Sequence, residues 1–231
     1  MTTTHLLDPV TVDVVSDVVC PWCFLGKHRL DRAIAMVPEV TVEVHFRPYI
    51  LDESVPPAGV ERTAWMEARF GHGGDGPARI RAVHESLTEL GAAEDIPFAF
   101  DAIRLQPSSL DAHRLIRWAG VEGVQDEMVE RLFRLFFCEG ADIGDAAVLR
   151  TAAEACGMDG AMVARLLASD ADTQAVAQEI ETARRIGVTG VPCFIFDGRL
   201  AVMGAESAET LAMAIRQAFN QRAEAMNRDP T

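Results

Sequence analysis

The sequence predicts an α/β fold in which a β-α-β unit and a β-β-α unit are separated by a large all-helical insertion. Alternating or β-branched apolar runs, which predict strands, occur near the two ends of the chain. The middle of the chain is rich in Ala, Leu, Glu and Arg, which favour helices. We therefore predict one domain from residues 1–53 together with 188–231, and a helical insertion domain from residues 54–187. With 231 residues, 49% of them hydrophobic, the chain can bury a full core.

The first unit is predicted from three consecutive patterns. Residues 11–15 are rich in β-branched side chains, which favour a strand. Apolar residues then recur at helical spacing from Gly26 to Val37, until Pro38 ends the helix. Residues 40–47 alternate between apolar and polar, which predicts a strand with one buried face. Such a unit makes a parallel pair with a right-handed crossover, and its functional edge lies beyond the carboxyl ends of the strands.

Four helices are predicted in the later part of the insertion. The first begins behind Pro107, where Ser108 and Asp111 have the spacing of a capping pair. Gly157 and Gly187 are predicted to end the third and fourth helices. The predicted ranges are 108–120, 126–138, 145–156 and 172–186.

The last unit is predicted to be a hairpin followed by a helix. Two apolar runs, 193–196 and 200–203, flank the dipeptide Asp197-Gly198, and Asp-Gly between such runs is a strong hairpin signal. A closing helix is predicted from Ser207 to Phe219, and the tail from Arg222 is predicted to fray.

A pair of cysteines lies at the junction between the first predicted strand and the first helix. Cys20, Pro21, Trp22 and Cys23 place two thiols three residues apart, and residues at this spacing face the same side of a helix. The helix N-terminus favours negative charge at Cys20, and Pro21 suits the first helical turn. This context predicts a redox dithiol in which Cys20 attacks a disulfide and Cys23 resolves the mixed disulfide.

The other cysteines indicate neither a disulfide framework nor a metal site. The chain has five cysteines, an odd number, and Cys138, Cys156 and Cys193 form no second close pair with suitable histidines. A structural zinc site normally needs four nitrogen or sulfur ligands, so no metal is expected. These three thiols are expected to be buried and inert. A second redox pair between Cys138 and Cys156 stays open.

Charge and hydropathy limit the partners and the compartment. The net charge of −14 argues against nucleic acid and anionic membrane surfaces, because both need a basic footprint. No segment approaches the roughly 18 apolar residues that span a bilayer. Residues 1–9 lack the basic and apolar regions of a secretory signal. The expected location is the cytoplasm.

Three separated stretches resemble the DsbA family of thioredoxin-fold proteins, and within it the FrnE-like branch. They are Ser-Asp at residues 16–17 ahead of Cys-Pro-Trp-Cys-Phe-Leu-Gly-Lys at 20–27, Leu-Asp-Ala-His-Arg-Leu at 110–115, and Gly-Val-Thr-Gly-Val-Pro at 187–192. The resemblance extends over nearly the whole chain. It implies a thioredoxin-like fold with a helical insertion and the activity of a dithiol-disulfide oxidoreductase or isomerase.

The resemblance also implies the other half of the site. Pro192 is expected to be a cis-proline opposite the dithiol, and a cis X-Pro bond is typical of a tight turn. The backbone of Val191 would then form a short strand edge on which a substrate chain can pair. Thr189 and Val191 are expected to flank the substrate groove.

Departures from the family pattern leave open which residue acts as the general base and whether the protein oxidises or reduces its substrates. Asp17 lies three residues before Cys20. One expected role is to accept a proton or to tune the pKa of a thiol, and an equally favoured role is to accept hydrogen bonds from backbone N–H groups of a turn. Thioredoxin-like reductases have a buried acid six residues before the nucleophile, and this chain has Val14 there. Trp22 replaces the histidine of strongly oxidising DsbA proteins, which disfavours a strong oxidant. His113 is expected to be a structural residue.

The sequence therefore predicts a disulfide reductase or isomerase with no bound cofactor and with glutathione or another thiol as redox partner. Its substrate would be a disulfide-containing protein or a small thiol compound. One alternative is a glutathione-dependent transferase or isomerase on the same scaffold, as in kappa-class transferases and hydroxychromene carboxylate isomerases, which have serine in place of Cys20. Another is a non-enzymatic module that binds a metal or a partner. The substrate, the redox direction and the choice between monomer and homodimer stay open.

Overall fold

The computed structural model describes residues 8–71 and 75–228, which form a mixed four-stranded sheet with helices on both faces. The strand order is β2-β1-β5-β6. β1 (Val10–Ser16) is parallel to β2 (Val42–Pro48) and antiparallel to β5 (Cys193–Phe196), which is antiparallel to β6 (Leu200–Met203). The predicted thioredoxin-like fold with a helical insertion is confirmed.

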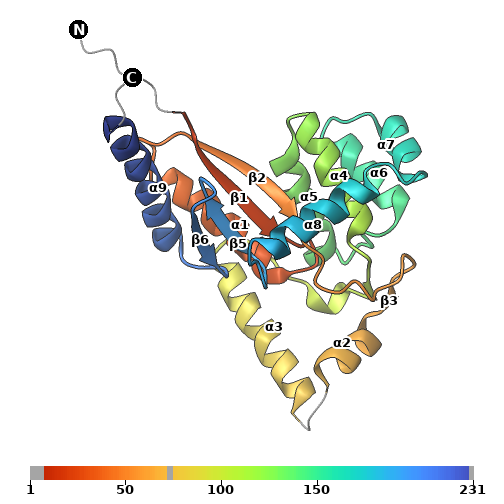
Figure 1. Ribbon diagram of the computed structural model, residues 1–231. Coiled ribbons are helices and arrows are strands. Elements are labelled where there is room, and N and C mark those ends of the chain that lie inside the picture. The colour runs from red at the N-terminus through yellow and green to blue at the C-terminus, as the bar shows by residue number, and fades with distance from the viewer. Residues whose placement is uncertain (1–7, 72–74, 229–231) are drawn as a thin grey trace.

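The two faces of β1 pack against different helices. Val10, Val12 and Val14 lie in the main core with α1 (Pro21–Ala35) and α9 (Ala208–Arg228), which pack side by side. Val15 on the other face packs against Ala183 of α8 (Thr173–Arg185). Alternation along a strand therefore separates the α1 and α9 side of the sheet from the α8 side, as Figure 1 shows.

The predicted hairpin and closing helix are present, although the helix is longer than expected. Asp197 and Gly198 both have positive φ, 51° and 65°, in the three-residue loop between Phe196 and its strand partner Leu200, and Asp and Gly are residues that tolerate this left-handed conformation. α9 continues to Arg228, so the predicted tail is helical as far as the structure describes it, and residues 229–231 of that tail lie outside the described residues. Arg222 donates to the carboxylate of Asp197 at 2.6 Å and to the carbonyl of Pro9 at 2.7 Å, which ties this part of α9 to the sheet.

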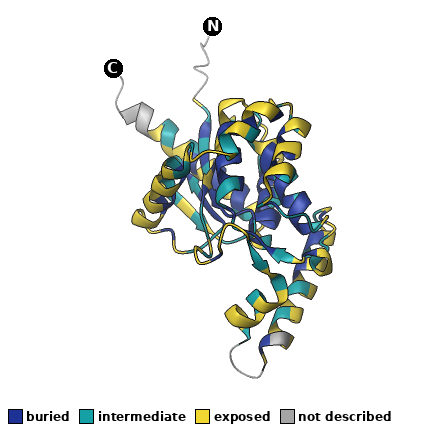
Figure 2. Cartoon of the chain, turned by 90° about the vertical axis from the view of Figure 1, so that its right-hand side faces the viewer, coloured by how far each residue is buried: buried dark blue, intermediate teal, exposed yellow. Residues whose placement is uncertain are grey.

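The insertion contains helices and one short pair of strands. Its elements are β3 (Val60–Glu61), α2 (Arg62–Phe70), α3 (Gly76–Ala92), the 3-10 turn η1 (Phe100–Ala102), β4 (Leu105–Gln106), α4 (Leu110–Val121), α5 (Gln125–Phe137), α6 (Ala146–Ala155), α7 (Gly160–Leu167) and α8. The two-residue strands β3 and β4 pair antiparallel, a feature that the expectation of an all-helical segment missed. α2 and α3 form a projecting hairpin that is largely exposed (Figure 2).

The start of α4 differs from the predicted capping pair. Its N-cap residue is Ser109, which makes no side-chain cap hydrogen bond. Asp111 instead binds the guanidinium of Arg114 at 2.7 Å. Arg114 is buried and also donates to the carbonyls of Leu166 and Ala171, so its charge recruits the nearby carboxylate. An ion pair between residues three apart in the same helix is therefore formed in place of the predicted cap.

Aromatic rings join the first helix to the insertion. Phe24 follows directly after the dithiol and is fully buried. Its ring stacks on Phe133 of α5 with centroids 5.0 Å apart and meets Phe98 edge-on at 5.8 Å. Such aromatic pairs stabilise the fold beyond the burial of their surface, so they attach the beginning of α1 to the insertion. None of the described helices combines the length and the apolar character that a bilayer-spanning segment needs.

Candidate active site

The dithiol occupies the turn between β1 and α1. Cys20 is the N-cap residue of α1, with φ −99° and ψ 113°, and Pro21 occupies the first turn. The Cys20 amide donates to the carbonyl of Asp17 at 2.9 Å, and the Cys23 amide donates to the carbonyl of Cys20 at 3.0 Å. The strand, turn and helix are as predicted, and Cys20 lies at the positive end of the helix dipole.

The two thiols have different surroundings. Cys23 is 2% exposed, and burial raises the pKa of its thiol well above the usual range. The hydrogen bond and charge of Cys20 raise this pKa further, and the backbone of Asp17 acts in the opposite direction. Cys23 is therefore held as a thiol at neutral pH. Trp22, between the two cysteines, is 36% exposed and forms part of the surface around them.

The segment before β5 packs against the dithiol from the other end of the chain. The Val191-Pro192 peptide bond is cis, as predicted. Cys20 Sγ lies 3.8 Å from the carbonyl oxygen of Val191. Pro192 is buried and Val191 is half-buried, whereas Thr189 is exposed and makes no hydrogen bond to the dithiol in the part of the chain that the structure describes. Two segments about 170 residues apart thus form one site.

Asp17 is a fully buried carboxylate beside the dithiol. It accepts a hydrogen bond from the Leu51 amide at 2.8 Å and from the Val19 amide at 3.4 Å. Its charge is among the causes that raise the pKa of Cys23. Asp17 thus satisfies backbone amides, which is one of the two roles considered for it, and its role toward the thiols stays a prediction. Val14, at the position of the usual acid, is part of the apolar core.

His113 is a neighbour of Asp17 that the sequence did not assign to the site. Its Nε2 lies 2.9 Å from the carbonyl oxygen of Tyr49 and 3.5 Å from Oδ1 of Asp17. Both side chains of this pair are buried. The one signal for it in the sequence was its place in the Leu-Asp-Ala-His-Arg-Leu stretch, because the contact joins a helix of the insertion to the loop after β1.

The remaining cysteines lie away from the dithiol. Cys138 and Cys156 are half-buried C-cap residues of α5 and α6, and burial raises the pKa of each thiol. Cys193 is buried on the α8 face of the sheet with Val15. All five cysteines are free. Within residues 8–71 and 75–228, no three His, Cys, Asp or Glu side chains gather as a metal site.

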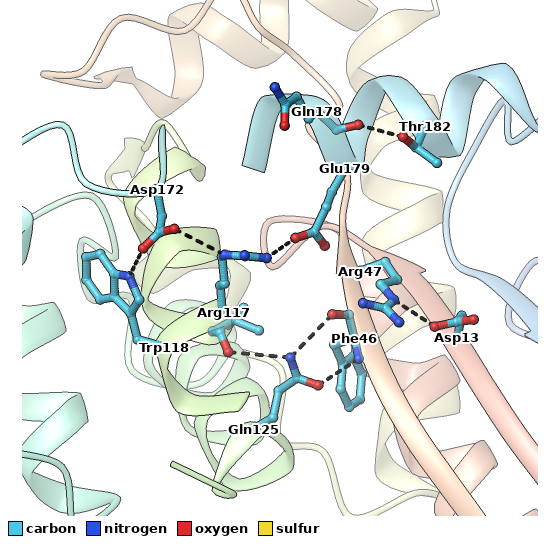
Figure 3. A network of polar contacts seen from close by, with 11 residues as sticks. Asp13, Phe46, Arg47, Arg117, Trp118, Gln125, Asp172, Gln178, Glu179 and Thr182 are labelled. Carbon is cyan, nitrogen blue, oxygen red and sulfur yellow. Dashed lines mark hydrogen bonds and ion pairs between the residues drawn. The ribbon is translucent and has the colours of Figure 1, made fainter. Parts of the chain in front are cut away.

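Two cavities lie near α8. The first, of about 620 Å³, is lined by residues of β2, α4, α5 and α8 and includes His113 and Gln125. The second, of about 710 Å³, lies between α8 and strands β1, β5 and β6. Figure 3 shows the polar contacts around them: Gln125 binds the backbone of Phe46, and Arg117 binds Glu179. Arg117 and Glu179 line both cavities, so the two are neighbours.

The fold and the paired cysteines define a thioredoxin-fold protein with a Cys-X-X-Cys pair at the start of its first helix. Residues 11–216 match the DSBA-like thioredoxin domain, and the chain belongs to this family.

Three relatives extend the comparison. A probable DsbA oxidoreductase of Streptomyces coelicolor, SCO1869, is 29% identical with a TM-score of 0.84, covering 91% of this chain and 90% of that one. The uncharacterized protein YwbO of Bacillus subtilis (strain 168) is 28% identical and covers 89% of this chain and 96% of its own. A 2-hydroxychromene-2-carboxylate isomerase shares 18% identity with a TM-score of 0.69, covering 93% of this chain and 98% of that one, and shows the fold alone.

Proposed function

We propose that this protein is a cytoplasmic thiol-disulfide oxidoreductase that reduces or isomerises substrate disulfides. The observation that carries the proposal is the placement of Cys20 at the N-terminus of α1, with Sγ 3.8 Å from the Val191 carbonyl and with buried Cys23 one turn further on. The FrnE-like branch is the proposed place in the family. Residues 1–53 with 188–231 form the proposed redox domain, which residues 54–187 cover.

The first step is attack by Cys20 on a substrate disulfide. The Cys20 thiolate forms a bond to one substrate sulfur, the substrate S–S bond breaks, and the other sulfur leaves with the electron pair. The backbone of Val191, beside Pro192, pairs with the substrate chain, and exposed Thr189 flanks it. Trp22 supplies apolar contact surface around the reacting sulfur.

The second step is resolution of the mixed disulfide by Cys23. Because Cys23 is held as a thiol, it must lose a proton before it attacks Cys20 Sγ, and the Asp17 carboxylate is the proposed acceptor. The Cys20–Cys23 bond forms, the bond from Cys20 to the substrate breaks, and the second substrate sulfur leaves with its electron pair. The protein dithiol is oxidised by two electrons, and glutathione or another thiol returns it to the reduced state.

The proposed direction rests on Trp22 and on the reducing compartment. A dithiol is a strong oxidant when its reduced form is strongly stabilised. The indole of Trp22 carries no positive charge that would stabilise a thiolate at Cys20, so this position does not favour a strong oxidant. The test combines turbidity from insulin reduction with the Cys20–Cys23 reduction potential, measured against glutathione buffers. We expect insulin reduction that is lost in Cys20→Ser, and a potential near the glutathione range. A potential near that of DsbA would overturn the direction.

A glutathione-dependent transferase or isomerase is the second candidate. The similarity to the hydroxychromene isomerase concerns the fold, and Cys20 in place of serine argues against this activity. Turnover of a glutathione conjugate by a Cys20→Ser variant would favour it. Stoichiometric zinc together with absence of insulin reduction would instead favour a non-enzymatic binding module.

A further inference from the structure

The two edge strands of the sheet, β2 and β6, differ in what covers their outer side. At the β2 edge, the Phe46 amide donates to the side chain of Gln125 at 2.9 Å, and the Gln125 amide donates to the Phe46 carbonyl at 3.4 Å (Figure 3). Gln125 therefore binds this edge as a neighbouring strand would, and α4, α5 and α8 also pack against β2. In the part of the chain that the structure describes, β6 has no strand neighbour other than β5 and no side-chain hydrogen bond to its backbone.

The register between β5 and β6 determines which backbone groups of β6 point outward. The Gly204 amide donates to the carbonyl of Pro192 at 2.8 Å, which makes these two residues a hydrogen-bonded pair of the ladder. Hydrogen-bonded and non-hydrogen-bonded pairs alternate along antiparallel strands. In the observed register, Val202 is therefore bonded to β5, whereas the N–H and C=O groups of Ala201 and Met203 point away from β5. The open edge offers a donor and an acceptor at each of these two residues.

The side chains of β6 do not protect this edge from pairing. Its sequence, Leu-Ala-Val-Met, contains neither lysine nor proline, the residues that commonly keep an edge strand from binding another chain. Ala201 is exposed and Met203 is 45% exposed. Both line the second cavity on the α8 face of the sheet, together with Ile186, which is 63% exposed. Apolar surface thus accompanies the free backbone groups.

We infer that the β6 edge is an interface at which two copies of this chain pair antiparallel around a two-fold axis through Val202. In this alignment Ala201 of each copy lies opposite Met203 of the other, and each such pair exchanges both of its outward backbone hydrogen bonds. The two four-stranded sheets then form one continuous sheet. A two-fold interface needs a surface that is complementary to itself, and the paired donors and acceptors of this edge meet that condition.

Charges at the two ends of β6 favour the antiparallel arrangement. Arg199 directly precedes the strand, Glu206 follows shortly after it, and both are exposed. Neither side chain forms an ion pair with another described residue. Antiparallel pairing brings Arg199 of one copy to the end of the strand that carries Glu206 of the other, so opposite charges meet at both ends of the interface. Parallel pairing would bring like charges together.

The end of β6 also has room for the second copy. Leu200 of the second copy comes opposite Gly204, where an added Cβ atom would meet nothing within 4 Å. Glycine at this position leaves space for the larger side chain to approach. Because the Gly204 amide binds the carbonyl of Pro192, the interface ends beside the segment that carries the cis-proline. The inference itself does not depend on redox activity.

Sedimentation velocity of the reduced full chain, over a series of protein concentrations, measures the association. The net charge of −14 makes two copies repel each other at long range, so the ionic strength is held at about 0.15 M, where charges are screened beyond about 8 Å. We expect a reversible equilibrium between monomer and dimer. Hydrogen exchange of the same samples should show that the Ala201 and Met203 amides become protected as the concentration rises.

Ala201→Pro should weaken the dimer about tenfold or more, because it removes an outward N–H group from each copy. The substitution leaves the bonds to β5 in place, since proline is tolerated on an edge strand where the N–H faces solvent. If Ala201→Pro does not fold, Ala201→Lys keeps the backbone and places a charge on the apolar surface, which should also weaken association.

Exchange of the end charges tests the antiparallel alignment. Arg199→Glu and Glu206→Arg should each weaken the dimer, because each places like charges at both ends of the interface. The double variant should recover most of the affinity, since it restores opposite charges there. Arg165→Glu is the matched control: Arg165 is an exposed residue of α7, and the substitution changes the net charge as Arg199→Glu does but should leave association unchanged.

Four results would overturn the inference. One is a wild-type chain that stays monomeric at millimolar concentration, and another is a dimer that forms equally well in Ala201→Pro and Ala201→Lys. A double charge exchange that recovers no affinity would exclude the antiparallel alignment. Protection of the Ala201 and Met203 amides only when an unfolded polypeptide is added, while the chain remains monomeric, would assign the β6 edge to a different partner. Reduction of insulin by a monomeric variant would leave the proposed function intact in each case.

Discussion

Gly26 of α1 lies directly against Pro192. A Cβ atom added at Gly26 would be 3.1 Å from Pro192 Cγ and 3.0 Å from the ring of Phe194, both closer than ordinary van der Waals contact. The helix that carries the dithiol and the segment that carries Val191 are therefore packed without a side chain between them. Glycine at this position allows the two halves of the site to meet.

Gly26→Ala should destabilise the protein and slow disulfide reduction. Alanine gains about 0.5–1 kcal/mol over glycine in a helix, but forcing an extra carbon into a packed core costs about 1–3 kcal/mol. The packing cost is expected to win, since Pro192 is a rigid ring. Urea unfolding and insulin reduction measure the two effects. Gly190→Ala is the control, because a Cβ there meets nothing within 4 Å; equal stability of both variants would contradict the packing argument.

The pKa of Cys23 should make the stability of the reduced protein depend on pH. Burial and the neighbouring Cys20 raise the pKa of Cys23 well above its usual range, whereas a cysteine in the unfolded chain has a pKa of about 8.5. A raised folded-state pKa means that the full stability is present below the unfolded pKa. As pH rises above it, the unfolded chain loses a proton that the folded chain keeps, and stability falls by up to about 1.4 kcal/mol per pH unit.

Urea unfolding of the reduced protein from neutral to alkaline pH tests this dependence. Cys193 contributes in the same direction, because burial raises the pKa of its thiol too. The difference between the wild-type protein and Cys23→Ala therefore isolates Cys23. Parallel stability curves for these two proteins would show that Cys23 ionises equally in the folded and unfolded states.

Periodicity and local turn chemistry predicted the elements that bear the site. The hairpin follows from Asp197-Gly198 between apolar runs, and the strand-to-helix position of the dithiol follows from residues within about ten positions of Cys20. Local patterns could not predict the contacts of Asp17, because Leu51 is 34 residues and His113 is 96 residues further along the chain. Local patterns specify backbone states, whereas the neighbours of a buried carboxylate depend on how distant elements pack.

Lys27 should contribute to the attachment of α1 to α5. Its side chain is 3% exposed, and its Nζ lies 2.9 Å from Asp31, 3.1 Å from Asp126 and 3.6 Å from Glu130. Burial alone would lower the pKa of Lys27, but these three carboxylates outweigh burial and raise it. Lys27→Met removes the cation that Asp31 and Asp126 share, whereas Glu130 keeps its ion pair with Arg134 at 2.6 Å.

We expect Lys27→Met to lower the free energy of unfolding by about 1–3 kcal/mol, less than for a fully buried pair because Asp31 and Asp126 are half exposed. Thermal unfolding of the reduced protein measures this loss. Arg150→Met removes an exposed pair with Glu154 and should change stability by less than about 1 kcal/mol. A Lys27→Met variant as stable as Arg150→Met would show that the cluster adds nothing beyond a surface ion pair.

Trp22→His should make the dithiol more oxidising. Trp22 lies between the cysteines and is 36% exposed, so a histidine there can adopt several orientations near Cys20 Sγ. A protonated imidazole stabilises the thiolate, and stabilising the reduced form raises the reduction potential. A tenfold gain in the reduced form corresponds to about 30 mV for this two-electron couple. Trp22→Phe, which adds no charge, should leave the potential near its original value.

Equilibration of each variant with glutathione buffers, followed by trapping and separation of the reduced and oxidised forms, gives the two potentials. The increase in Trp22→His should diminish as the pH rises and the imidazole loses its charge, because a neutral ring no longer favours the thiolate. The same variant should reduce insulin more slowly, since its dithiol gives up electrons less readily. An unchanged potential in Trp22→His would mean that this position does not face the reacting sulfur, and the reductase direction would then need another cause.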